Sequence, residues 1–152
     1  MQINNLFANR NVLAWVLMIL ALAIHVFDEA ISGFLPFYNS SVTALREKFS
    51  LFPAPTFSFD LWLGGLIVGI LLCSGLTVLV ARGGKPIRWF VTILGVIMII
   101  NALGHLTGSV YFGRMIPGAY SSPMLFLSAV YVVVRCLHGD WRIREKTSPG
   151  AT

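Results

Sequence analysis

The chain has 152 residues, of which 57% are hydrophobic and only 11% are charged. Soluble domains average about 25% charged residues, and a chain of this length leaves roughly 30% of its unfolded surface exposed after folding. This composition therefore excludes a soluble enzyme, a disordered chain and a disulfide-stapled secreted module, and it predicts an integral membrane protein. The net charge of +5 is explained by membrane topology, so no nucleic-acid partner is expected.

Four apolar segments are long enough to be membrane spans, since about 20 helical residues cross about 30 Å of hydrocarbon. They cover residues 12–34, 59–81, 89–111 and 123–137. The last segment is the shortest, and Tyr120 and Trp141 flank it as candidate interfacial anchors. We predict an all-α fold, an integral membrane four-helix bundle that forms a single domain over residues 1–152, with a flexible polar tail at residues 146–152.

The loop after the first span, residues 35–58, contains apolar residues at helical spacing and ends with two prolines. The apolar residues are Val42, Leu45, Phe49 and Phe52. We predict a short amphipathic helix that lies at the membrane interface and is capped by Ser40 or Ser41. A plain connector is the alternative.

Basic residues near the span ends predict the orientation, because cytoplasmic loops carry an excess of Lys and Arg. One side of the membrane has eight of them: Arg10, Arg82, Lys85, Arg88, Arg135, Arg142, Arg144 and Lys146. The other side has three: Arg46, Lys48 and Arg114. We therefore predict that both termini are cytoplasmic, and we expect the location to be a bacterial cytoplasmic membrane.

Glycines recur at helix-packing spacing in the second and third spans. Gly65-x-x-x-Gly69 and Gly104-x-x-x-Gly108 are pairs of small residues that allow two helices to approach closely. We predict that these faces pack inside the bundle, with homodimerisation through one of the Gly-rich faces as the alternative.

Ionisable residues inside spans are the most informative ones, because a carboxylate at a helix centre costs about 2.5–3.5 kcal/mol on insertion scales. The first span contains His25, Asp28 and Glu29, at i, i+3 and i+4, and the third contains Asn101 and His105, at i and i+4. Both spans run from the inside to the outside, so the two histidines share a level in the outer half of the bilayer. We predict a site there with Glu29, His25, Asp28 and His105 as its catalytic residues.

Further polar residues belong to the same outer end of the predicted bundle. We assign substrate binding to Asn101, Asp60, Tyr111, Arg114 and Tyr120. A helix-capping role is the alternative for Asp60, because an acidic residue is favourable at a helix N-terminus.

The motif His25-x-x-Asp28-Glu29, together with His105 and Pro117-Gly118, resembles the HXXEE-domain family of small four-span membrane proteins. The family signature is His-x-x-Glu-Glu, a further histidine and Tyr-x-Pro-Gly. Here the first glutamate is replaced by Asp28 and the tyrosine by Met115. The function of that family is unknown, so the resemblance supports the site and leaves its chemistry open. The pair His25-x-x-x-Glu29 with Asn101 is also similar to the polar centre of four-span sterol-isomerase-like membrane proteins.

Three functions fit these residues. In the first, the protein is an enzyme that acts on a lipophilic small molecule, and His25, Glu29 and His105 bind one divalent metal ion, Zn or Fe. Asp28 is then a fourth ligand or the partner that fixes the His25 tautomer. In the second, a metal-free site performs acid–base isomerisation or cyclisation of sterol- or isoprenoid-like substrates. In the third, the protein is not an enzyme and binds membrane lipid or has a structural role. We favour an enzyme.

Overall fold

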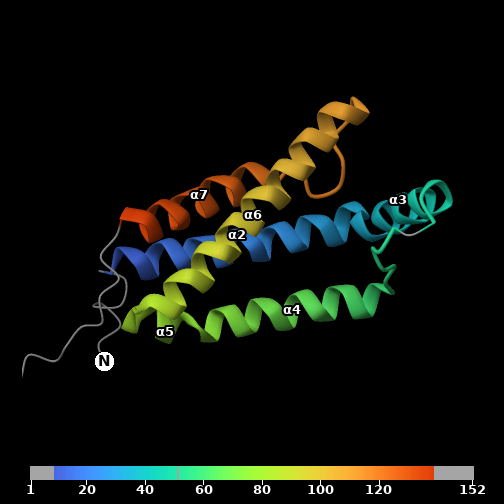
Figure 1. The fold of residues 1–152 in the computed structure, drawn as a ribbon. Coiled ribbons are helices and arrows are strands. Elements are labelled where there is room, and N and C mark those ends of the chain that lie inside the picture. Colours follow the sequence, from blue (N-terminus) through green and yellow to red (C-terminus); the bar gives the residue numbers. More distant parts are fainter. Residues whose placement is uncertain (1–8, 51, 139–152) are drawn as a thin grey trace, which may run out of the picture.

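The structure is a computed structural model, and it describes residues 9–50 and 52–138 (Figure 1). Six helices and no strands form the regular secondary structure of these residues, which confirms the all-α prediction. The helices are α2 (Arg10–Ser32), α3 (Phe34–Lys48), α4 (Phe59–Gly75), α5 (Thr77–Arg82), α6 (Lys85–Phe112) and α7 (Ser122–His138). The predicted tail at 146–152 lies outside the described residues, as do Trp141, Arg142, Arg144 and Lys146.

Three of the predicted spans form helices that are long and apolar enough to cross a membrane. They are α2, the segment Phe59–Arg82 that combines α4 and α5, and α6, with 23, 24 and 28 residues. Helix α7 is apolar but has only 17 residues, which is the lower limit for a spanning helix. The chain thus has the helices of a membrane protein, as its composition predicts.

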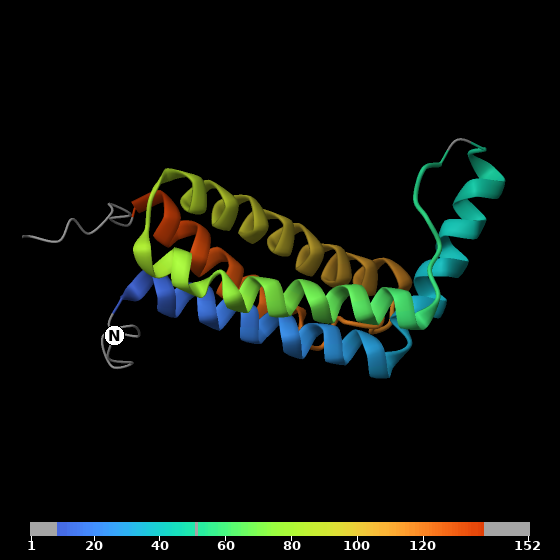
Figure 2. The ribbon, with the colours of Figure 1, turned by 90° about the horizontal axis from the view of Figure 1, so that it is seen from below.

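Helices α2, α4 and α7 run roughly along one long axis, α6 crosses them obliquely, and α3 projects from the end of the bundle where α2 finishes (Figures 1 and 2). Helix α2 contacts α4, α5 and α7, and α6 packs against α7. The start of α2 and the end of α7 lie at the other end of the bundle. A core of buried apolar side chains fills that end, among them Trp15, Met18, Val91 and Val132.

The junction between α2 and α3 differs from the prediction. Gly33 adopts a left-handed conformation with φ of 80°, and its N–H donates to the carbonyl oxygen of Glu29, so α2 ends at Ser32 and α3 begins at Phe34. The predicted helix in this loop is therefore present, but capping by Ser40 or Ser41 is wrong. Both hydroxyls donate inside α3 to the carbonyl oxygen of Phe37. The helix ends at Lys48, ahead of the prolines.

The predicted packing of the glycine pairs inside the bundle is also wrong. A Cβ atom placed on Gly65, Gly69 or Gly104 would have no described atom of another part of the chain within 4 Å, and one on Gly108 would meet Ile116 in the following loop. The close helix approach occurs instead at Gly95 of α6, where a Cβ would lie 2.7 Å and 3.0 Å from methyl groups of two valines of α7. Homodimerisation through a glycine face stays a prediction.

Gly95 and Gly104 therefore give a matched pair of variants on one helix. We expect Gly95→Leu to destabilise the bundle by about 1–3 kcal/mol, because the new side chain forces α6 away from α7. Gly104→Leu has open space and should leave the unfolding midpoint nearly unchanged. Thermal unfolding in detergent micelles, followed by tryptophan fluorescence, measures both. Equal midpoints for the two variants would contradict the close packing of α6 on α7.

Candidate functional site

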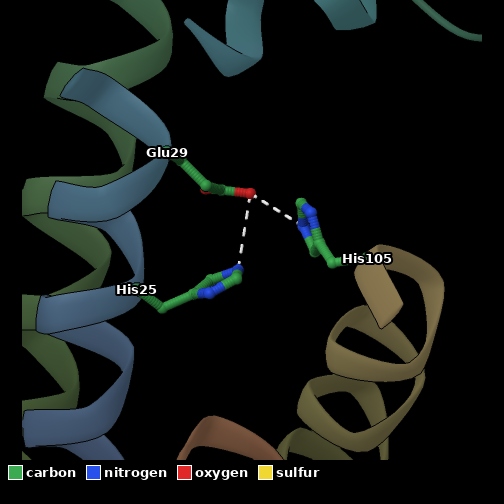
Figure 3. Close-up of side chains that lie close together, drawn as sticks. All are labelled: His25, Glu29 and His105. Atoms are coloured by element: carbon green, nitrogen blue, oxygen red, sulfur yellow. Dashed lines mark ion pairs between the residues drawn. The ribbon is translucent and has the colours of Figure 1, made fainter. Parts of the chain in front are cut away.

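His25 and Glu29 are one turn apart on the buried face of α2, and His105 faces them from α6 (Figure 3). Their exposed fractions are 1%, 5% and 6%. The Nε2 atom of His105 lies 3.0 Å from Oε1 of Glu29, and the Nε2 atom of His25 lies 3.5 Å from the same oxygen. The two imidazole rings meet edge to face with centroids 4.9 Å apart. Two helices therefore bring two imidazoles to one carboxylate oxygen.

The loop between α6 and α7, residues 113–121, folds back toward α2 (Figure 1) and contacts this cluster. The carbonyl oxygen of Pro117 lies 2.7 Å from Nδ1 of His105. Gly118 has φ of 84°, and a Cβ there would lie 2.7 Å from the ring of His105 and 3.0 Å from Cγ of Glu29. Only glycine can take this conformation without strain and leave room for both side chains. The Pro-Gly motif thus packs directly on the site.

Ser121, which the sequence did not identify, binds the other histidine. Its Oγ atom lies 2.8 Å from Nδ1 of His25 and donates to Oδ2 of Asp28 at 2.8 Å, and its backbone N–H donates to the same Asp28 oxygen at 3.0 Å. The only signal for Ser121 in the sequence is its place just after the Pro-Gly motif. Asp28 is thus connected to His25 through Ser121.

These contacts assign the protons of His105. A carbonyl oxygen only accepts hydrogen bonds, so His105 must carry a proton on Nδ1 to bind Pro117. In the neutral imidazole its Nε2 atom then presents a lone pair toward Glu29. The Nε2 atom of His25 is buried and has no hydrogen-bond partner among the described residues.

Three ligand atoms therefore converge, since one nitrogen of each histidine and one carboxylate oxygen of Glu29 lie within 4.8 Å of one another, and the Nε2 atoms of both histidines face Oε1 of Glu29. Two ligands bound at about 2.0–2.1 Å to a tetrahedral metal ion lie about 3.4 Å apart, and the two measured distances to Glu29 of 3.0 and 3.5 Å bracket that value. The donor set of two imidazoles and one carboxylate fits Zn²⁺ or Fe²⁺ and leaves coordination positions open. Without a metal, the short contact between Glu29 and His105 suits a shared proton.

Aromatic side chains border the cluster on the side of α3 and α4. The ring of Phe34 lies 5.4 Å from the ring of His105, and Trp62 lies 5.9 Å from Phe34. Both are half-buried. An apolar molecule at the cluster would find these rings beside it.

The structure does not bring the remaining predicted residues to the cluster. Asp60, Tyr111, Arg114 and Tyr120 are all exposed. Asp60 lies in the first turn of α4, where it also suits a helix N-terminus. Asn101 lies one turn before His105, and its buried Oδ1 atom has no hydrogen-bond partner among the described residues. The substrate-binding roles of these five residues stay predictions.

A comparison with protein families covers the segment that contains the cluster. A family model described as "protein of unknown function with HXXEE motif" matches residues 15–133, which include the whole cluster and the loop that covers it. No curated protein and no solved structure matches the chain. Because the family model covers most of the sequence, the chain belongs to the HXXEE family.

Proposed function

We propose that this protein is a four-span integral membrane enzyme that binds one divalent metal ion through His25, Glu29 and His105 and acts on a lipophilic substrate. The observation that carries the proposal is the buried Nε2 atom of His25, which has no hydrogen-bond partner among the described residues and lies 3.5 Å from Glu29. A neutral imidazole nitrogen in that position is available as a ligand.

The surroundings of the two histidines support this proposal. Metal-binding histidines almost always donate their other ring N–H to a carboxylate, a carbonyl oxygen or water. Here Nδ1 of His105 faces a backbone carbonyl, and Nδ1 of His25 faces a serine that is itself bound to a carboxylate. Both rings are therefore held with Nε2 directed at the proposed metal.

An ester or amide of a lipid is the substrate class that this arrangement serves best. A metal ion with open positions polarises a carbonyl group or activates water for its hydrolysis. The half-buried rings of Phe34 and Trp62 border the cluster and suit an apolar chain. The burial of all three ligands keeps bulk water away from the reacting group.

The proposed topology places the site in the outer half of the bilayer. We take α7 as the fourth span and α3 as an interfacial helix, with both chain termini in the cytoplasm. The start of α2 and the end of α7 lie at one end of the bundle, as an even number of crossings requires (Figure 1). Eight of the eleven Lys and Arg residues belong to that side in this topology.

A metal-free acid–base enzyme that isomerises or cyclises a sterol- or isoprenoid-like substrate is the second candidate. The 3.0 Å contact between Oε1 of Glu29 and Nε2 of His105 favours it, since a proton can be passed between these atoms. A non-enzymatic lipid-binding or structural role would use the same cluster without turnover.

Metal content separates the first candidate from the others. We expect purified protein to contain about one zinc or iron ion per chain by inductively coupled plasma mass spectrometry, because three donor atoms converge in a buried site. His25→Ala and His105→Ala should each abolish this content, and His138→Ala, at the exposed end of α7, should preserve it. Wild-type protein that is active without metal would contradict the metal proposal and leave the acid–base candidate.

A neutral replacement of Glu29 separates an active site from a structural cluster. We expect Glu29→Gln to remove metal binding. Without metal, the variant should unfold at the same temperature as metal-free wild type or at a higher one. The reason is that a buried charge lowers the stability of the fold, and active sites often keep such a charge despite this cost. Thermal unfolding after chelation measures this, with Glu47→Gln, on the exposed surface of α3, as control. A large loss of folding in Glu29→Gln alone would instead support the structural role.

The orientation is tested with topology reporters. We expect a reporter that is active only in the cytoplasm to be active when it is fused after Thr152. A reporter that is active only outside the cytoplasm should be active when it is inserted between α3 and α4. Both expectations follow from the distribution of basic residues. A fusion after Thr152 that reads outside would contradict the proposed topology.

A further inference from the structure

We infer that Ser121 and Asp28 are positioning residues that hold the proton of His25 on Nδ1, so that the loop between α6 and α7 sets which nitrogen faces Glu29. This inference deepens the proposed function and rests on it for the metal-binding measurement below. The position of the proton can be tested in the metal-free protein.

The hydroxyl group of Ser121 has one hydrogen and three polar neighbours. Its Oγ atom lies 2.8 Å from Oδ2 of Asp28, 3.2 Å from the carbonyl oxygen of Gly118 and 2.8 Å from Nδ1 of His25. A carboxylate oxygen and a carbonyl oxygen only accept hydrogen bonds. The hydrogen therefore goes to Asp28, the nearer and charged acceptor, and Oγ accepts the proton that His25 carries on Nδ1.

The opposite assignment is unfavourable. If Ser121 donated to an unprotonated Nδ1 atom of His25, its Oγ atom would face Oδ2 of Asp28 at 2.8 Å with no hydrogen between them. Ser121 is 8% exposed, so water has little access to relieve that contact. Asp28 also accepts the backbone N–H of Ser121 at 3.0 Å, which holds its oxygen in place.

The two histidines differ in what holds their Nδ1 protons. His105 donates to the backbone of Pro117, which no side-chain substitution removes, whereas His25 depends on a side chain. Removal of the Ser121 hydroxyl leaves Nδ1 of His25 without an acceptor. The proton then moves to Nε2, where Oε1 of Glu29 lies 3.5 Å away. His105 is therefore an internal reference for His25.

Nuclear magnetic resonance of ¹⁵N-histidine-labelled, metal-free protein in detergent micelles tests this directly, because two-bond ¹⁵N–¹H correlations distinguish the two tautomers. In the metal-free wild type we expect a proton on Nδ1 of both His25 and His105, with a further proton shared between Nε2 of His105 and Oε1 of Glu29. In Ser121→Ala the proton of His25 should move to Nε2 while His105 stays unchanged. Asp28→Ala should shift His25 in the same direction but less far, because the hydroxyl group of Ser121 can still donate to the carbonyl oxygen of Gly118 at 3.2 Å. Signals are assigned by replacing each of the three histidines in turn.

Three further variants separate positioning from general stability. Ser122→Ala is the matched control, since Ser122 is fully buried and donates to the carbonyl oxygen of Gly118. It should leave the His25 tautomer unchanged. Ser121→Thr should preserve the wild-type tautomer and Ser121→Val should lose it, although the two side chains have nearly the same shape. This pair decides the question if Ser121→Ala does not fold.

Zinc affinity provides the second measurement. We expect Ser121→Ala to weaken zinc binding by about 10–100-fold, which is typical when the partner of a ligating histidine is lost, and Ser122→Ala to bind zinc like the wild type. If wild-type protein binds no zinc, the proposed function fails and the tautomer measurement still decides the inference. Wild-type His25 protonated on Nε2, or indistinguishable spectra for Ser121→Ala and Ser122→Ala, would overturn it. A shift in Ser121→Ala without one in Asp28→Ala would overturn the role of Asp28.

Discussion

The contact on which the site depends is the return of residues 113–121 onto the two histidines. Two helices alone bring His25, Glu29 and His105 together, but they leave both imidazoles free to turn and to exchange protons between their nitrogens. The loop removes that freedom by binding Nδ1 of each ring, through the backbone of Pro117 and the hydroxyl of Ser121. A cluster that would otherwise be two histidines near an acid becomes a set of three defined donor atoms.

The same loop accounts for the two acidic residues near the end of α2. Carboxylates at the C-terminal end of a helix oppose its dipole, and burial adds a desolvation cost. Asp28 is stabilised by the N–H of Ser121, immediately before the N-terminus of α7, where a negative charge is favourable. Glu29 lies between the two imidazoles. Each acid therefore has a local partner, and Asp28 stabilises the loop while Glu29 takes part in the site.

The cluster of His25, Glu29 and His105 could be predicted from the sequence because it is formed by side chains, whose positions follow from the residue types and their spacing. The i, i+4 spacing of His25 and Glu29 and the shared depth of His105 are properties of helices and of a bilayer, and they can be derived from residue numbers. Pro117 takes part through a main-chain carbonyl, which any residue type supplies. Ser121 has a short side chain whose role depends on how the loop folds back, and no periodicity describes that path.

The helix face used for close packing and the start of α3 could not be predicted from the sequence, for physical reasons. Glycine spacing identifies a helix face that allows close approach, but it does not fix the rotation of the helix, and the close contact occurred at Gly95 rather than at either predicted pair. The start of α3 depends on the left-handed conformation of Gly33, which ends α2 and lets α3 begin at the next residue without an intervening loop. Either serine would have been a reasonable cap had α2 ended in an open turn.

The position of the cluster above the packed core explains how helices that diverge can still hold it. Ala21 of α2 and Ala102 of α6 lie about one turn before His25 and His105, and both pack with Leu125 of α7 in a buried group beneath the site. Short side chains at these two positions let α7 support α2 and α6 together. Beyond this level the polar contacts of the loop hold the cluster in place. The site therefore lies between this buried group and the loop, so its geometry depends on both.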